Sequence, residues 1–133
     1  MPKLHWSLLC QQAIIDKNTN SASYLNTVEE LGIESFPSQL PPITVATIWR
    51  KEETENEEIR MRVRITGPLP EPITFEANET FGDFKRYRIN RGLGGIPVEE
   101  SGTLNFHIEH YDEGEWNTRW RIPVGIRAIS LDD

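Results

Sequence analysis

Cysteine is nearly absent from this chain of 133 residues, since Cys10 is the only one. A single thiol excludes an intramolecular disulfide, and an unpaired cysteine is typical of proteins in a reducing compartment. The sequence also lacks any apolar run of the roughly 20 residues that a membrane-spanning helix needs. The apolar run at Leu8 and Leu9 is shorter than the core of a secretory signal, which has about 7–15 residues. We therefore expect a cytoplasmic location and no membrane partner.

Positive charge is in deficit as well. Fourteen Lys and Arg stand against 21 Asp and Glu, which gives a formal net charge of −7. This excess of negative charge repels nucleic acids and anionic membranes over the molecule as a whole. We therefore do not expect a nucleic acid as a partner, although a local basic surface remains compatible with the composition.

The sequence shows no signature of catalysis, metal binding or cofactor binding. His107 and His110 lie three positions apart on a predicted strand, so they should face opposite sides and cannot share a metal ion. The glycine-rich segment 92–95 lacks the Gly-Lys-Ser/Thr ending and the following helix of a phosphate loop. Cys10 has no visible partner that would make it a nucleophile and is expected to be a buried thiol. We expect no catalytic residue, no metal and no cofactor.

What the chain does contain is arginine that alternates with apolar residues. Residues 57–66 read EEIRMRVRIT, and the alternation returns in residues 84–91 (FKRYRINR) and 117–123 (NTRWRIP). A period of two is typical of a half-buried strand, because successive side chains point to opposite faces of a sheet. Seven arginines on the polar parity form the candidate binding site: Arg60, Arg62, Arg64, Arg86, Arg88, Arg119 and Arg121.

Turn-forming segments divide the remaining sequence into short strands. Asparagine-rich, proline-rich and glycine-rich segments at 17–20, 36–42, 67–72 and 92–95 separate apolar or alternating stretches, and residues 112–115 form the turn of a closing hairpin. The pattern predicts an all-β, single-domain antiparallel β-sandwich of about eight strands over residues 1–133, with a small β-barrel as the alternative. A helical turn at residues 25–31 is a second open alternative, because Glu29 and Glu30 favour helix.

The same parity predicts which side chains face the core. Trp120 is included because it stands between Arg119 and Arg121. The predicted inward residues are Leu8, Ile14, Val45, Met61, Val63, Phe75, Tyr87, Ile89, Leu104, Phe106, Ile108, Trp120 and Ile122.

Two interpretations of the arginines stay open. If the three arginine-bearing strands are neighbours, their guanidinium groups form one basic surface that suits carboxylate or phosphate groups. Alternatively, the arginines pair across strands with Glu76, Glu109 and other outward carboxylates, which serves solubility and adds little energy. The glutamate-rich segment 52–58 is expected to be a solvated hairpin tip, with an acidic docking loop as its functional alternative.

The chain resembles a family of uncharacterised bacterial domains of unknown function. The resemblance rests on Tyr24 to Val28 followed by Phe36-Pro37, on residues 40–45 (LPPITV), and on a closing hairpin that begins at residues 101–106 (SGTLNF). It spans most of the chain, and its motifs are structural. It implies a compact sandwich without known catalysis, and it offers no functional residues to carry over.

These observations predict a non-enzymatic, cytoplasmic interaction module that acts through protein contacts. Its partner is an unknown protein, for which an acidic surface is one candidate, and self-association into a homo-oligomer stays open. The alternative is a module that binds a sugar or an anionic metabolite through the arginine surface or through aromatic residues such as Trp49, Tyr111 and Trp116. An enzyme of unknown class is the third possibility.

Overall fold

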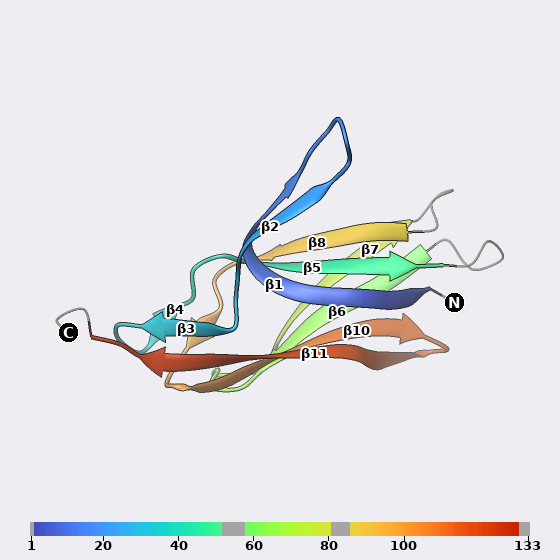
Figure 1. Cartoon of the computed structure of the whole chain (residues 1–133). Helices are drawn as coiled ribbons and strands as arrows, with labels where there is room; N and C mark the ends of the chain where they lie inside the picture. Colours follow the sequence, from blue (N-terminus) through green and yellow to red (C-terminus); the bar gives the residue numbers. More distant parts are fainter. Residues whose placement is uncertain (1, 52–57, 81–85, 131–133) are drawn as a thin grey trace.

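The computed structural model describes residues 2–51, 58–80 and 86–130, and this part of the chain is built from strands without a helix (Figure 1). The strand with the first predicted arginine alternation, at residues 58–66, alternates in exposure as the sequence predicts, and each of the eight predicted strands has a counterpart. The strands are β1 (Lys3–Ile15), β2 (Ala22–Thr27), β3 (Glu30–Ile33), β4 (Ser38–Gln39), β5 (Ile43–Arg50), β6 (Glu58–Thr66), β7 (Ile73–Thr80), β8 (Arg86–Leu93), β9 (Pro97–Val98), β10 (Gly102–Asp112) and β11 (Glu115–Ala128).

The strands form two large sheets and one small one. A four-stranded sheet has the order β2-β1-β5-β8, a five-stranded sheet has the order β3-β11-β10-β6-β7, and β4 pairs with β9. All pairs are antiparallel except β11 with β3, which is parallel. The proline-rich segment 36–42 separates strands as predicted and carries the chain from one sheet to the other, because the chain leaves β3 in one sheet and enters β5 in the other.

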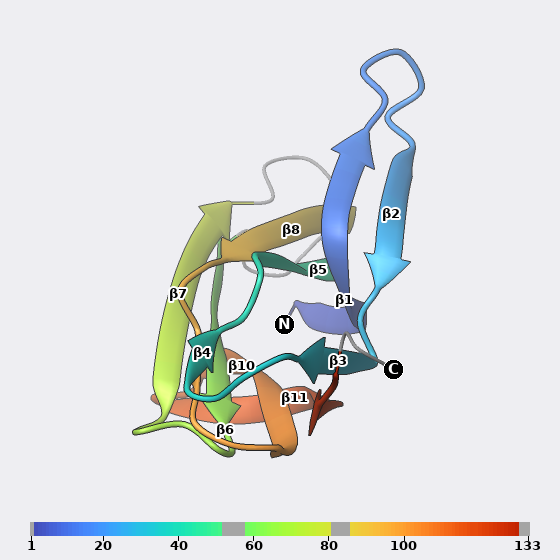
Figure 2. The same ribbon diagram turned by 90° about the vertical axis from the view of Figure 1, so that its left-hand side faces the viewer.

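The two sheets approach each other at both edges. β7 lies near β8 on one side, and β1 lies near β11 on the other. Figure 2 shows the resulting outline, in which the strands surround a common interior. The fold is therefore an all-β sandwich with barrel-like closure, and it lies between the two predicted architectures.

The core fills the space between the sheets with aliphatic and aromatic side chains. Trp49 of β5 and Phe106 of β10 are its largest fully buried members. The buried indole N–H of Trp49 has a hydrogen-bond acceptor, because Nε1 donates to Thr47 Oγ1 at 3.0 Å. Thr47 Oγ1 in turn donates to the Ile89 carbonyl at 2.8 Å. Seven predicted inward residues are buried: Val45, Met61, Val63, Ile89, Leu104, Phe106 and Ile108.

The other predicted inward residues divide into three groups. Phe75, Tyr87 and Ile122 pack partly buried against the core. Leu8 is half-buried, but it stands opposite Ala46 and so lies on the other face of the sheet from the core residue Leu9, and its predicted inward direction is wrong. Ile14 and Trp120 are exposed by 44% and 39%, so their predicted burial is wrong.

The errors at Ile14 and Trp120 arise where a strand extends beyond its neighbours. Ile14 lies in the last part of β1. Beyond Cys10 this strand no longer pairs with β5 and pairs only with β2. Trp120 stands opposite Ile108 on the inward parity, but β3 pairs with β11 only from Gly125 onward. At Trp120 the strand β11 is therefore an edge, and the indole lies at the rim of the sandwich.

Tight turns fix the register of the hairpins. In the turn between β10 and β11, Glu113 and Gly114 both have positive φ, at 53° and 81°, as a two-residue hairpin loop of the type I′ class requires. Gly67 after β6 has φ 138°, and a Cβ there would lie 2.5 Å from the Thr103 carbonyl oxygen. The predicted turns at 67–72 and 112–115 are thus confirmed.

Three short strands were not predicted. The return arm after the first turn divides into β2 and β3, which lie in different sheets, and no helical turn forms at residues 25–31. β4 and β9 have two residues each. β4 lies in the segment predicted as a proline-rich connection, and β9 follows the glycine-rich segment 92–95, of which Gly92 and Leu93 belong to β8. Of the predicted acidic tip at 52–58, residues 52–57 lie outside the described residues and Glu58 begins β6. The turn expected at Gly82 and Asp83 also lies outside the described residues.

Candidate functional site

The seven candidate arginines lie on two different sheets. Arg60, Arg62 and Arg64 belong to β6 and Arg119 and Arg121 to β11, both in the five-stranded sheet. The remaining two, Arg86 and Arg88, belong to β8 at the edge of the four-stranded sheet. The strands are not neighbours, since β10 separates β6 from β11. One continuous basic surface from all seven is therefore excluded.

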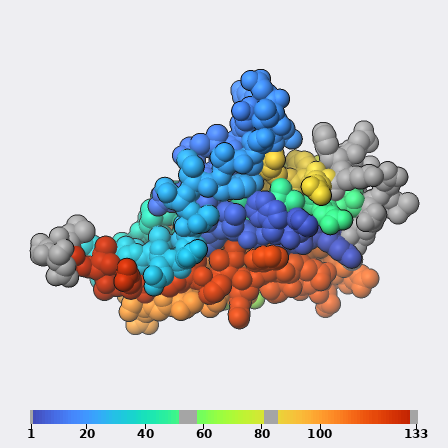
Figure 3. Space-filling view, viewed as in Figure 1, coloured from blue at the N-terminus to red at the C-terminus, as the bar shows by residue number. Residues whose placement is uncertain are grey.

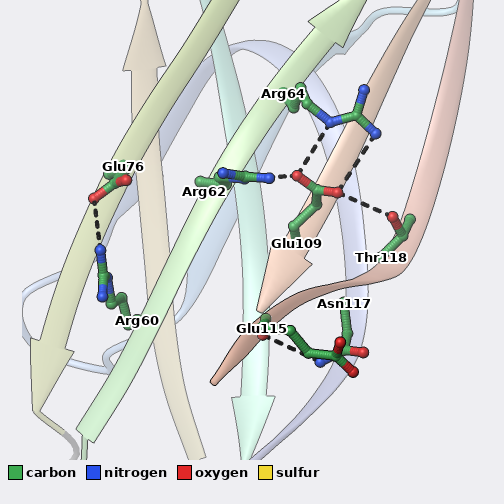
Figure 4. A network of polar contacts seen from close by, with 8 residues as sticks. All are labelled: Arg60, Arg62, Arg64, Glu76, Glu109, Glu115, Asn117 and Thr118. Carbon is green, nitrogen blue, oxygen red and sulfur yellow. Dashed lines mark hydrogen bonds and ion pairs between the residues drawn. The ribbon is translucent and has the colours of Figure 1, made fainter. Parts of the chain in front are cut away.

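The centre of the five-stranded sheet carries a buried carboxylate between two of these arginines. Glu109 of β10 stands opposite Arg62 of β6, and its residue exposure is only 4%. Arg62 Nε donates to Glu109 Oε1 at 2.7 Å, and Arg64 Nε donates to the same oxygen at 3.2 Å. Thr118 Oγ1 donates to Oε2 at 3.1 Å from the other side (Figure 4).

The charge of Glu109 is stabilised by these donors. Burial is the largest single influence and would raise the pKa of this carboxyl group. The hydrogen bonds from Arg62, Arg64 and Thr118, with the charge of Arg64, together outweigh burial and hold the pKa below its ordinary value. Glu109 is therefore an ionised structural anchor for two arginines.

Next to this network, two arginines and two aromatic rings form an arginine–aromatic cluster: Arg60, Arg62, Tyr111 and Trp116. The rings of Tyr111 and Trp116, opposite each other on β10 and β11, meet edge to face with centroids 5.3 Å apart. Arg60 Cζ lies 4.6 Å from the Tyr111 centroid, and Arg62 Cζ lies 4.3 Å from that of Trp116. These distances are typical of cation–π contacts. Arg60 also lies 3.8 Å from the carboxylate of Glu76.

The arginines of β11 lie apart from this cluster. A shift of register between Ile108 and Glu109 leaves Arg119 without a partner residue in the ladder, and its Nη2 lies 3.8 Å from Asp112 Oδ2. Arg121 stands opposite His107 and is exposed. It makes no ion pair with any other described residue.

The two histidines of β10 face opposite sides, as predicted. His107 lies on the outer face, 3.1 Å from Thr66 Oγ1, and burial followed by the charge of Arg64 lowers its pKa. His110 is buried and contacts Trp49 edge to face at 5.1 Å. Burial and then the charge of Arg119 lower the pKa of His110. Both side chains are therefore neutral at pH 7.

The outer face of the four-stranded sheet carries a second set of cations that the alternation did not reveal. Lys3 of β1 stands opposite Arg50 of β5, which in turn stands opposite Arg86 of β8. All three are exposed and make no ion pair within the described ranges. Two residues further along β8, Arg88 donates from Nη2 to the Asn20 carbonyl at 2.8 Å. Lys3 is the first residue of β1 and Arg50 is the last residue of β5, and both strands are mainly apolar. Only the strand order could therefore have placed these two cations beside Arg86.

The structure decides two further sequence interpretations. Trp49 is fully buried, so it cannot line a surface site, whereas Tyr111 and Trp116 are accessible in part. Cys10 is fully buried, and burial raises its pKa, which disfavours the thiolate.

Across residues 2–51, 58–80 and 86–130, no group of three or more His, Cys, Asp and Glu side chains could hold a metal ion. The same residues form no helix of the length and hydrophobicity that crossing a membrane requires.

The chain belongs to a family of unknown function, DUF6941, which matches residues 5–125. This match confirms the resemblance to a family of domains of unknown function. Neither a curated protein nor a solved structure matches the chain.

Proposed function

We propose that this protein is a non-enzymatic module of a bacterial cytoplasm that binds another protein through the outer face of its five-stranded sheet. The observation that carries the proposal is the arginine–aromatic cluster, in which Arg60 and Arg62 stack on Tyr111 and Trp116. Arginine, tyrosine and tryptophan are the residues that most often dominate the energy of protein interfaces.

The cluster is arranged before any partner arrives. The ring pair fixes Tyr111 and Trp116 against each other, and Glu109 holds Arg62 from below. Side chains that are already ordered lose less entropy on association, so more of their contact energy appears as affinity. A partner that meets this surface therefore encounters rigid rings with guanidinium groups at their faces.

An acidic partner segment fits the charge of this face. On the outer face, Arg60, Arg62 and Arg64 each lie in a row of residues that stand opposite one another on neighbouring strands of the five-stranded sheet. These three rows contain four cations, which are Arg60, Arg62, Arg64 and Arg121, and two carboxylates, which are Glu76 and Glu109. Glu109 is buried, so its charge is unavailable to a partner, while Arg60 and Arg121 are exposed. Carboxylates of a partner would find donors there with the fork geometry that arginine provides.

The test places a photo-crosslinking residue at position 78, which is exposed and stands opposite Arg60 on β7, and, as a control, at position 44 on the outer face of the opposite sheet. We expect position 78 alone to capture one discrete protein in cells of the source organism. The purified partner is then titrated by calorimetry against the native protein. Arg60→Gln and Trp116→Ala should each weaken its binding about tenfold or more, as residues that dominate an interface do.

Arg127→Gln is the matched control, because Arg127 is an exposed arginine at the far end of β11. It should leave affinity unchanged, and thermal melts verify that each variant is folded. Arg62 and Arg64 are unsuitable as probes, because they hold Glu109 and their replacement would disturb the fold. Capture of no protein from position 78, or equal affinity for native protein and Arg60→Gln, would refute the proposal.

A further inference from the structure

A cleft lies on the opposite side of the molecule, between the β1–β2 hairpin and the outer face of the four-stranded sheet. The hairpin projects from the body of the molecule (Figure 3). The cleft has a volume of about 580 Å³, which is within the usual range for small-ligand sites. It is lined by His5, Trp6, Asn20, Ile48, Arg86, Tyr87 and Arg88.

The turn of the hairpin is built so that its tip contacts β8. Asp16 Oδ1 accepts from the backbone nitrogens of Asn18 at 2.8 Å and Thr19 at 3.2 Å, which closes the turn. Asn20 follows in the left-handed region, with φ 58°. Its carbonyl and its Oδ1 accept from Arg88 Nη2 and Nη1 at 2.8 and 3.3 Å. These two bonds join the hairpin to the sheet and orient the Arg88 guanidinium beside the cleft.

The cleft is cationic on a protein that is acidic overall. Its lining contains two arginines and no carboxylate. The row Lys3–Arg50–Arg86 places three positive charges directly opposite one another on adjacent strands, and like charges in that position are destabilising. No ion pair within the described part of the chain relieves this repulsion. A bound anion at Arg86 would do so.

The other walls of the cleft are apolar. Trp6 of β1 stands opposite Ile48 of β5, which stands opposite Arg88 of β8. Trp6 is held edge to face by Tyr24 of β2, with ring centroids 5.5 Å apart and an interplanar angle of 87°. The Tyr24 hydroxyl is buried close to Arg88, whose charge favours the ionised form, although burial has the larger effect and raises the pKa of Tyr24. An apolar wall with a cation beside it suits a ligand with a ring and one charged end.

We infer that this cleft binds a small organic anion, whose planar ring packs against Trp6 and Ile48 and whose carboxylate or phosphate accepts hydrogen bonds from Arg86. The site lies on the other sheet from the arginine–aromatic cluster, so each proposal stands without the other.

The inference is tested with four probes in calorimetric titrations of the full chain. 2-Naphthoate and 2-naphthyl phosphate combine the same ring with the two candidate anionic groups, 2-naphthol keeps the ring without the anion, and inorganic phosphate is the anion without the ring. We expect both ring-bearing anions to bind with one site per chain, and the tighter of the two identifies the preferred anionic group. 2-Naphthol and inorganic phosphate should bind about tenfold more weakly or worse, because each lacks one half of the recognition.

Two substitutions locate the binding. Arg86→Gln and Trp6→Leu should each weaken binding of the better anion about tenfold or more. Arg127→Gln is the matched control, since it removes one exposed arginine from the other sheet, outside the arginine–aromatic cluster, and should change affinity less than about twofold. Melting curves verify that Trp6→Leu is folded, and Arg86→Gln provides the decisive result if it is not.

Three outcomes would overturn the inference. One is no heat of binding for either ring-bearing anion. Another is equal binding of 2-naphthol and 2-naphthoate, which would show that the charge is not recognised. The third is equal weakening by Arg127→Gln and Arg86→Gln, which would show attraction by overall charge and not a site.

Discussion

On the outer face of the five-stranded sheet, Arg62 and Arg64 both donate to Glu109, whereas on the outer face of the four-stranded sheet Lys3, Arg50 and Arg86 stand in one row. The first group is compensated by a buried carboxylate. The second makes no ion pair anywhere in the described ranges. Of the second group, only Arg86 was placed on an outward parity by the same period of two as Arg62 and Arg64, so parity alone does not separate a paired arginine from an unpaired one.

The difference shows what makes a cationic surface available to a ligand. A guanidinium that already has a carboxylate partner belongs to the fold, because its removal leaves that partner uncompensated. A guanidinium without such a partner is free to bind an anion at little structural cost. The strand order determines which case applies, since it sets the residue that lies across the ladder.

The largest loss of stability is expected from replacing Glu109, because this carboxylate is buried and neutralises the charge of two arginines. Glu109→Gln leaves Arg62 and Arg64 without their shared carboxylate and should lower the free energy of unfolding by about 2–3 kcal/mol. Urea unfolding at pH 7.5 measures this. Glu76→Gln is the control, because Glu76 meets Arg60 at 3.8 Å with 46% of its side chain exposed, and it should cost about 0–1 kcal/mol. Equal losses for the two variants would contradict the distinction between structural and exposed pairs.

Protonation of the two histidines of β10, His107 and His110, should lower the stability of the folded protein at acidic pH. The pKa values of His107 and His110 are lowered in the folded protein, first by burial and then by the charges of Arg64 and Arg119, respectively. Below pH about 6.5 the unfolded chain therefore binds protons that the folded chain does not. Stability is fully present above that pH and should fall with acidification by up to about 1.4 kcal/mol per pH unit for each histidine.

Urea unfolding at pH 7.5 and 5.5 measures this loss. The pKa of Glu109 is lowered in the folded protein, so its contribution to stability is lost only at more acidic pH, below the ordinary carboxyl range of about 4.3. His107→Gln and His110→Phe should each reduce the difference between the two pH values. A protein that becomes more stable at pH 5.5 would show that one of these histidines gains, and does not lose, a favourable partner on protonation.

Much of the fold could be predicted from the sequence because the alternation is regular. β6 reads Ile59, Met61, Val63 and Ile65 on its buried parity, and all four are buried. The prediction failed where a neighbouring strand ends, as at Trp120, or where a register shift adds a residue, as at Arg119. Such events depend on the pairing of distant segments, which the local pattern does not contain.

The candidate site could be predicted only in part. The alternative of cross-strand pairing with Glu76 and Glu109 is confirmed for Arg60 and Arg62, although the burial of Glu109 makes its pairs more than a device for solubility. Arg86 and Arg88 were grouped with arginines that lie on the other sheet. Their actual neighbours are Arg50 and Asn20, and they follow from the antiparallel pairing of β5 with β8 and from the turn of the β1–β2 hairpin.

The smallest effect, and the one of opposite sign, is expected on the four-stranded sheet. Arg86→Gln removes the end of the row Lys3–Arg50–Arg86 and relieves a like-charge contact between directly opposite residues. It should therefore leave the free energy of unfolding unchanged or raise it by up to about 0.5 kcal/mol, whereas Arg62→Gln lowers it.

Salt should distinguish the native protein from Arg86→Gln, because raising ionic strength from about 0.1 M to 1 M shortens the screening length from about 10 Å to 3 Å. The native protein should gain stability from screening of this row, and Arg86→Gln should gain less. A loss of about 1 kcal/mol or more in Arg86→Gln at low salt would show that Arg86 has a structural partner, and the contrast between the two faces would then fail.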